Sequence, residues 1–143
     1  MKIAVINGPN LNMLGVREPE VYGIDSLNEL ISSLRIEFSG IEILDFQSND
    51  EGALIGEIQR RGMSCDGLII NPGGYSHTSV AIRDAIASVK APVIEVHISN
   101  IHSREEFRHT TITGGACAAV ISGLGLKGYS VAIAHFDSVL IKH

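Results

Sequence analysis

Short apolar runs alternate along this chain with segments in which apolar residues recur every three or four positions. The runs lie at 2–7, 41–47, 67–71, 92–97 and 116–121. Runs so short and so apolar predict β-strands that are covered on both faces, as in a parallel sheet.

Segments with helical periodicity follow the predicted strands. Ser26 and Glu29 form a Ser-x-x-Glu capping box at the start of the first helix, and Ser48 and Glu51 repeat the pattern at the start of the second. A third helix is expected to begin near Thr78. The residues predicted to face the core from these helices are Leu27, Leu30, Ile31, Leu34, Phe38, Leu54, Ile55, Ile58, Ala81, Ala85, Ile86 and Val89.

Five consecutive strand–helix units predict one α/β domain over residues 1–143. We expect a flavodoxin-like three-layer sandwich in which a five-stranded parallel sheet has the strand order 2-1-3-4-5. A Rossmann-type order would need another strand, and a TIM barrel would need about 250 residues. The segment 101–115 is expected to be irregular, with a short helical turn at 103–107, and the last helix is expected at about 124–141.

This topology predicts where a ligand would bind. In open α/β sheets, ligands lie outside the carboxyl ends of the strands. The polar loops at 8–23, 71–79 and 97–109 should therefore converge on one site. They hold most of the potentially reactive side chains in the chain.

Composition narrows the classes of function. The formal net charge is −5, which argues against nucleic acid as a partner but allows a small anionic ligand beside local arginines. No apolar run reaches the ~18 residues of a membrane span, and the start of the chain lacks the features of a signal peptide, so we expect a cytoplasmic protein. Cys65 and Cys117 are expected to be reduced thiols, and no Cys/His spacing resembles a metal site.

The first polar loop is longer than the ~2–6 residues usual for such a connection, which favours an active-site lid at about 13–24. It contains Asn10, Arg17 and Tyr22. Tyr22 is a weak base at the ordinary tyrosine pKa of ~10, but a neighbouring cation such as Arg17 would favour the phenolate. The pair is therefore a candidate general base, although packing of the tyrosine on its own loop is the alternative.

The other two loops offer a proton donor and polar binding groups. Glu95 and His97 are two positions apart on a predicted strand, so they point to the same side, and the carboxylate can orient the imidazole as a general acid. Asn71 and His77 belong to a glycine-rich loop that can approach a ligand closely. Arg108 follows the last of these strands, and solvent exposure beside Glu105 and Glu106 is an equally good interpretation of Arg104 and Arg108.

Residues 123–128 match the pattern G-x-G-x-x-G between a strand and a helix. A dinucleotide-binding site also needs a following strand with an acidic residue ~20 positions on. We interpret these glycines as a tight turn with close helix packing.

Three segments carry a resemblance to a known family. NGPNLNMLGVREPEVYG at 7–23, NPGGYSHTSVAIRDA at 71–85 and IEVHISNIHSREEFR at 94–108 resemble the type II 3-dehydroquinate dehydratases, and nearly the whole chain takes part. Gly74, Ser76 and His109 stand where other residues are also familiar in that family. None of these three is among the residues to which the resemblance assigns a role.

The resemblance implies dehydration of 3-dehydroquinate, a small anionic polyol, to 3-dehydroshikimate without metal, cofactor or Schiff base. The reaction belongs to aromatic amino-acid biosynthesis or to quinate breakdown. Tyr22 would be the proton acceptor, Arg17 its lid partner, His97 the proton donor, and Asn10 a group that stabilises the enolate or orients His97. The implied substrate-binding residues are Asn71, His77, Ile98, Ser99, Arg108 and, from a neighbouring subunit, Asp84. A homododecamer built from trimers is also implied.

Three rival functions remain to be weighed. A flavin or phosphate binder predicts a Ser/Thr-rich loop after the first strand, but this loop carries Asn, Arg and Tyr. A signalling receiver domain needs an aspartate where the chain has Asn71. An inactive scaffold that works only as an oligomer is disfavoured by the presence of Arg17, Tyr22 and His97.

Overall fold

Five parallel strands form the middle layer of the structure, a computed structural model that describes residues 1–16 and 25–140. The strands are β1 (Lys2–Asn7), β2 (Glu42–Gln47), β3 (Gly67–Asn71), β4 (Val93–His97) and β5 (Ala119–Ser122). They pair in the order β2-β1-β3-β4-β5, and every pairing is parallel. The predicted parallel sheet and its strand order are confirmed.

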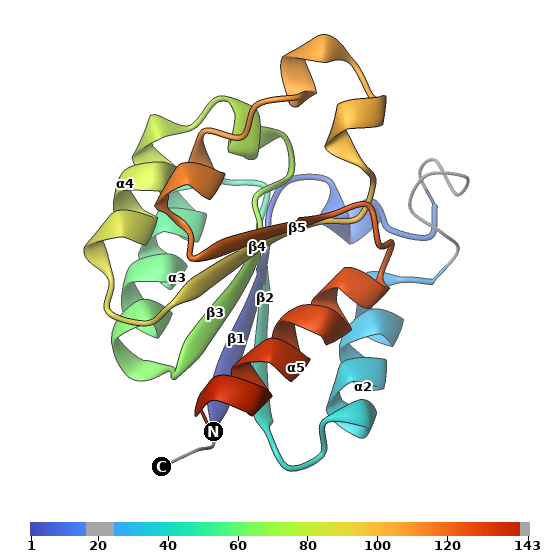
Figure 1. Ribbon diagram of the computed structural model, residues 1–143, viewed down its shortest axis with the longest axis vertical. Helices are drawn as coiled ribbons and strands as arrows, with labels where there is room; N and C mark the ends of the chain where they lie inside the picture. Colours follow the sequence, from blue (N-terminus) through green and yellow to red (C-terminus); the bar gives the residue numbers. More distant parts are fainter. Residues whose placement is uncertain (17–24, 141–143) are drawn as a thin grey trace.

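Helices cover both faces of this sheet (Figure 1). The helices α2 (Leu27–Glu37) and α5 (Lys127–Leu140) lie on one face, and α3 (Glu51–Ser64) and α4 (Val80–Ser88) lie on the other. Side chains alternate between the faces along β1, because Ile3 and Val5 belong to the cluster under α2 and α5 while Ala4 and Ile6 belong to the other. The three-layer, flavodoxin-like arrangement is thus the predicted one.

Short 3₁₀ turns carry the chain beyond the carboxyl ends of three strands. These turns are η1 (Leu11–Met13) after β1, η2 (Gly73–His77) after β3, and η3 (Ile101–Ser103) and η4 (Glu106–Arg108) after β4. A fifth turn, η5 (Thr113–Ala116), precedes β5. The described parts of the three predicted polar loops therefore meet at the carboxyl edge of the sheet.

Local differences from the predicted elements have physical causes. The capping box predicted at Ser48 is wrong, because α3 has Asp50 as its N-cap and the Ser48 hydroxyl accepts from the Asp50 amide instead. In α4, Ala85 and Ile86 are buried as predicted, but Ile82 takes the buried position predicted for Ala81, which is exposed.

The segment after β4 also differs from its prediction. The helical turn expected at 103–107 is replaced by η3 and η4, so Arg104 lies between two turns rather than one turn before Arg108. The turn η5 occupies the start of the strand expected at 116–121, and β5 begins at Ala119. The last helix begins at Lys127 instead of near 124.

The glycines at 123–128 form a tight turn, as predicted. Gly123 and Gly125 have φ values of 91° and 61°, a region that glycine adopts without strain. A Cβ on Gly128 would lie 3.0 Å from Cγ1 of Val96, so this glycine lets α5 approach β4 closely.

Two further findings concern the described ranges 1–16 and 25–140. No helix in them is both long enough and apolar enough to cross a membrane. Cys65 and Cys117 are free and half-buried.

Candidate active site

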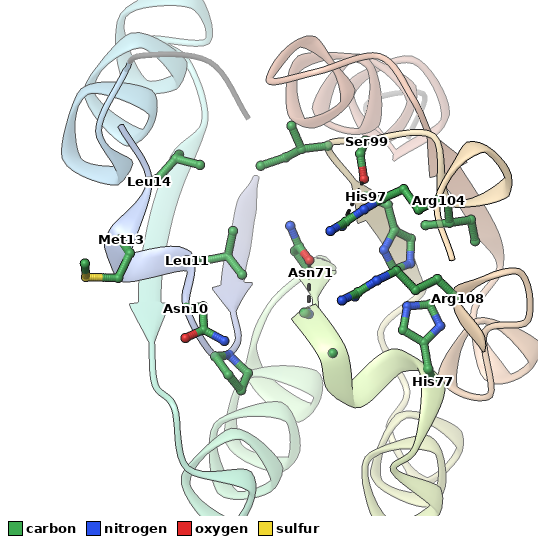
Figure 2. A pocket seen from close by; sticks show the side chains of 15 residues that line it. Asn10, Leu11, Met13, Leu14, Asn71, His77, His97, Ser99, Arg104 and Arg108 are labelled. Carbon is green, nitrogen blue, oxygen red and sulfur yellow. Dashed lines mark hydrogen bonds between the residues drawn. The ribbon is translucent and has the colours of Figure 1, made fainter. Parts of the chain in front are cut away.

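A pocket of about 120 Å³ lies at the carboxyl ends of β1, β3 and β4. In Figure 2, the segment after β1 forms one wall, the residues that follow β4 form the other, and Asn71 lies between them. The polar side chains that line the pocket are Asn10, Asn71, His77, His97, Ser99, Arg104 and Arg108. Met13, Leu14 and Ile101 are among its apolar lining residues.

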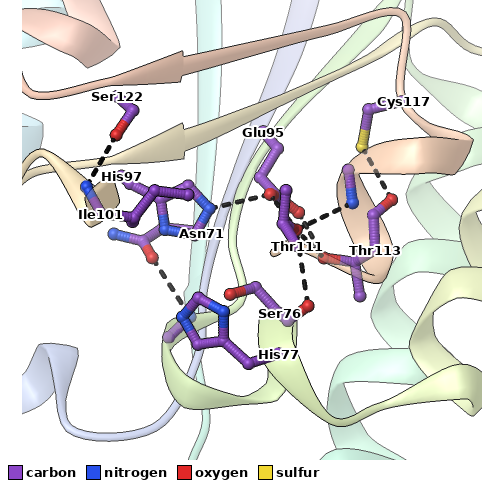
Figure 3. Close-up of polar contacts among 12 residues, drawn as sticks. Asn71, Ser76, His77, Glu95, His97, Ile101, Thr111, Thr113, Cys117 and Ser122 are labelled. Atoms are coloured by element: carbon purple, nitrogen blue, oxygen red, sulfur yellow. Dashed lines mark hydrogen bonds and ion pairs between the residues drawn. The ribbon is translucent and has the colours of Figure 1, made fainter. Parts of the chain in front are cut away.

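His97 is the last residue of β4 and is held from behind by Glu95 (Figure 3). Its Nε2 lies 2.8 Å from Oε2 of Glu95, and both side chains are buried. A carboxylate only accepts hydrogen bonds, so Nε2 carries a proton and Nδ1 is left for the pocket. Glu95 thus fixes the orientation of the ring and supplies the countercharge that a doubly protonated imidazole needs.

Two threonine hydroxyls complete the surroundings of Glu95. Thr111 donates to Oε2 over 2.6 Å and Thr113 donates to Oε1. Burial would raise the pKa of Glu95, but the hydrogen bonds from His97, Thr111 and Thr113 outweigh it and hold that pKa below its ordinary value of 4.5. The carboxylate is therefore kept charged inside the protein.

Asn10 projects from a left-handed turn directly after β1. Its φ is 72°, and its backbone N–H donates to Oδ1 of Asn49 over 3.0 Å. Gln47, at the end of β2, donates both to the same oxygen and to the carbonyl of Gly8. Gln47 and Asn49, at and just after the end of β2, therefore hold the turn that presents Asn10 to the pocket.

Asn71 forms the floor of the pocket. It is the last residue of β3 and is 4% exposed. Its Oδ1 accepts from the amide of Gly73 over 3.1 Å, and its Nδ2 lies 3.0 Å from the hydroxyl of Tyr129. The side-chain amide is thus anchored at both of its polar ends.

A second imidazole and two guanidinium groups lie around His97. The ring of His77 stacks against that of His97 with 6.1 Å between centroids. Its Nδ1 donates to the carbonyl of Thr110 over 2.9 Å, which leaves Nε2 as the nitrogen that can contact a ligand.

Two arginines lie on the wall of the pocket that follows β4. The guanidinium group of Arg104 lies 3.4 Å from the hydroxyl of Ser99, and that of Arg108 forms an ion pair with Glu105. Two cations beside neutral donors and acceptors suit an anionic ligand that carries hydroxyl groups.

Comparison with known proteins shows which family this chain belongs to. The family described as dehydroquinase class II matches residues 1–137. The chain belongs to the class II dehydroquinase family. Among relatives of this family, a 3-dehydroquinate dehydratase from Lachnoclostridium phytofermentans is 54% identical over 136 residues, which are 93% of this chain and 94% of that protein.

Two further relatives are similar over the same extent. A catabolic 3-dehydroquinase from Penicillium rubens is 51% identical over 135 residues, covering 93% of this chain and 86% of that protein. The crystal structure of a type II dehydroquinase from Butyrivibrio crossotus has 50% sequence identity and a TM-score of 0.93, covering 96% of this chain and 97% of that one. The fold and the family resemblance seen in the sequence are both confirmed.

The class II dehydroquinase pocket brings together most of the predicted site residues. Those that line it are Asn10, Asn71, His77, His97, Ile98, Ser99 and Arg108, and Glu95 lies directly behind His97. Asp84 lies on the exposed side of α4 and does not line the pocket of its own chain. Arg17 and Tyr22, with most of the predicted lid, fall outside the described residues.

Sequence reasoning missed the residues that support the site from behind. Thr111 and Thr113 lie 16 and 18 positions from Glu95, Asn49 lies between β2 and α3, and Tyr129 comes from α5. No periodicity links such residues to the pocket. Asn7 could have been found, because it ends β1 and is the register partner of Asn71.

Replacing Thr113 with valine is expected to destabilise the protein at neutral pH by about 1.5–3 kcal/mol, the range for a hydrogen bond to a charged group. The pKa of Glu95 is lowered in the folded state, so its stabilising contribution is present above about 4.5 and is lost as the pH falls through the folded value. The deficit of the variant should therefore shrink in acid.

Urea unfolding of both proteins at several pH values measures this deficit. Thr110→Val is a suitable control, because the Thr110 side chain is exposed and its carbonyl, which His77 uses, is retained. A deficit that stays constant down to acid pH would show that Thr113 contributes through packing and not through the charge of Glu95.

Proposed function

We propose that this chain catalyses the dehydration of 3-dehydroquinate to 3-dehydroshikimate through an enolate. The family match over residues 1–137 carries the proposal. The pocket at the carboxyl edge of the sheet supports it, because it holds a buried His97–Glu95 pair beside Arg108. The reaction needs a proton donor for a leaving hydroxyl group and cationic and neutral groups for an anionic polyol. These are the groups that line the pocket.

In the proposed mechanism, the Tyr22 phenolate removes a proton beside the ketone, and Arg17 stabilises that phenolate. The electron pair left on carbon forms an enolate, which Asn10 helps to stabilise directly or by orienting His97. The enolate then re-forms the ketone, and the carbon–oxygen bond to the neighbouring hydroxyl breaks. His97, doubly protonated for this step with Glu95 as its countercharge, gives its Nδ1 proton to the departing oxygen and keeps its Nε2 proton. The products are the enone and water.

The other groups bind the substrate. Asn71, His77, Ile98 and Ser99 would hold its hydroxyl groups, and Arg108 would pair with its carboxylate. Supporting this division, His77 lines the pocket with its Nδ1 already bonded to Thr110, and Arg108 lines the same cavity as His97. No lysine is among the described residues that line the pocket, which favours an enolate route over a Schiff base.

Assembly into trimers, and of trimers into a dodecamer in the cytoplasm, is part of the proposal. Asp84 is exposed on α4 and away from its own pocket, which would suit a residue that reaches a neighbouring subunit. The edge strand β5 also exposes Val120, whose side chain is 41% accessible. Light scattering of the purified chain would measure the assembly, and a monomer would contradict it.

The proposed activity is tested by following the absorbance of the enone when 3-dehydroquinate is added. We expect a steady rise that depends on enzyme concentration. Borohydride added together with substrate should leave the enzyme active, because no imine forms. No absorbance change at micromolar enzyme would contradict the activity, and inactivation by borohydride would contradict the route.

The metabolic role is one of two: biosynthesis of aromatic amino acids or breakdown of quinate. One similar protein is described as a catabolic 3-dehydroquinase and another simply as a 3-dehydroquinate dehydratase. Both roles use the same reaction. Rescue of a strain that needs aromatic amino acids, compared with growth on quinate, would separate them.

A further inference from the structure

A buried chain of side-chain hydrogen bonds runs beneath the pocket from β3 through α5 to β1. Asn71 and Asn7 end their strands and are register partners in the sheet. Tyr129, in the first turn of α5, reaches both and is 0% exposed. Its hydroxyl lies 3.0 Å from Nδ2 of Asn71 and 2.6 Å from Oδ1 of Asn7. One phenol therefore joins the floor of the pocket to the interior.

The direction of every hydrogen bond in this chain follows from one backbone group. The amide of Gly73 can only donate, so the Asn71 atom that it contacts at 3.1 Å is the acceptor Oδ1. The other end of the Asn71 amide is then Nδ2, which donates to the oxygen of Tyr129. The Tyr129 hydroxyl, having accepted, donates its own proton to Oδ1 of Asn7.

This arrangement leaves one buried donor unused. Nδ2 of Asn7 has no hydrogen-bond partner within the described residues, and an unpaired buried donor costs stability. Burial raises the pKa of Tyr129, although the hydrogen bond from Asn71 acts the other way, so the phenol keeps the proton that it donates. Apolar side chains could fill the same space without an unpaired group, so stability alone does not account for the network.

We propose that Tyr129 is a positioning residue for the reaction. By accepting one Nδ2 proton of Asn71, it fixes the polarity of that amide and leaves the second Nδ2 proton to donate into the pocket. The ligand atom that this donor recognises is an oxygen, such as a substrate hydroxyl oxygen. The kinetic part of this inference rests on the proposed function, while the positioning of Asn71 does not.

Tyr129→Phe is the kinetic test, because it removes the hydroxyl and keeps the ring. We expect KM for 3-dehydroquinate to rise by about tenfold, the loss expected for one hydrogen bond, with kcat retained within about twofold. Asn71→Ala should raise KM at least as much, and Tyr129→Phe should add nothing further to it, since Tyr129 acts through Asn71. Additive effects of the two changes on KM, or an unchanged KM in Tyr129→Phe, would overturn the proposal.

Phe136→Leu provides the matched control for lost packing on α5. Phe136 is 2% exposed on the same helix, and its ring packs against Gly67 at the opposite end of β3. This variant should lower the melting temperature and leave KM unchanged. If KM rose equally in Phe136→Leu and Tyr129→Phe, both changes would act by loosening the packing of α5. That result would contradict a positioning role for Tyr129.

A second readout does not depend on activity. The side-chain amide of Asn71 can be followed by NMR in isotope-labelled protein and assigned by its disappearance in Asn71→Ala. In Tyr129→Phe its Nδ2 protons should shift and exchange faster with solvent, and in Phe136→Leu they should not. Unchanged Asn71 signals in Tyr129→Phe would overturn the positioning. An inactive wild-type chain with the expected NMR change would overturn the proposed function alone.

Discussion

Replacing His97 with alanine is expected to lower kcat for dehydration by about 10²- to 10⁴-fold, the usual contribution of a positioned general acid. Hydroxide is a poor leaving group, so the carbon–oxygen bond breaks slowly unless a proton reaches the oxygen. His97 is 6% exposed, and its Nε2 is held 2.8 Å from Glu95. Because Glu95 occupies Nε2, Nδ1 is the nitrogen that donates in the proposed mechanism, and alanine leaves no group to replace it.

Two measurements on the same variant test this role. Enone absorbance follows dehydration, and deuterium uptake from heavy water follows removal of the proton beside the ketone. The His97→Ala variant should lose dehydration far more than deuterium uptake, because the proposed mechanism assigns proton removal to Tyr22. His102→Ala is the matched control, since His102 is exposed, contacts the His109 ring and does not line the pocket. Equal loss of both reactions would assign His97 to the first step instead.

Replacing Tyr22 with phenylalanine is expected to lower kcat by about 10²- to 10⁴-fold as well, the range for loss of a general base, with substrate binding retained. Tyr22 lies outside the described residues, and its proposed role follows from its chemistry, because a nearby cation favours the phenolate form of tyrosine. Besides His97, the titratable side chains in the described pocket lining are His77, Arg104 and Arg108. The arginines are permanently charged, which leaves His77 as the structural rival for the base.

A pair of variants decides between Tyr22 and His77. Tyr22→Phe should abolish both deuterium uptake and dehydration, while His77→Asn should mainly raise KM. Isothermal titration with substrate checks that Tyr22→Phe still binds. If His77→Asn lost deuterium uptake and Tyr22→Phe kept it, the base would be His77.

Much of the fold could be read from the sequence because its signals are local. The apolar stripe Leu30, Ile31 and Leu34 repeats with the helical period, and Ser26 caps α2 as predicted. The runs at 2–7 and 67–71 coincide with β1 and β3. Parallel order then follows from strand–helix alternation, and the order brings Asn71 and His97 to one edge of the sheet.

The parts that could not be predicted depend on contacts between distant segments. Ser48 has the residue type of a helix N-cap, but its hydroxyl accepts from the amide of Asp50, in the turn just before α3. Thr111 and Thr113 look like loop residues until the fold places them on Glu95. The start of β5 was misplaced because an apolar sequence, ACAAVI, can continue either a strand or a 3₁₀ turn.

Alanine is a poor probe of Asn10, whose backbone lies in the left-handed region. The change Asn10→Ala would remove the side-chain amide, and the Cβ of alanine would also clash with the backbone at a cost of about 1–2 kcal/mol. Glycine adopts the same backbone without that cost and removes the side chain alone. The contrast between Asn10→Gly and Asn10→Ala therefore separates the chemistry of this residue from the shape of the chain that presents it.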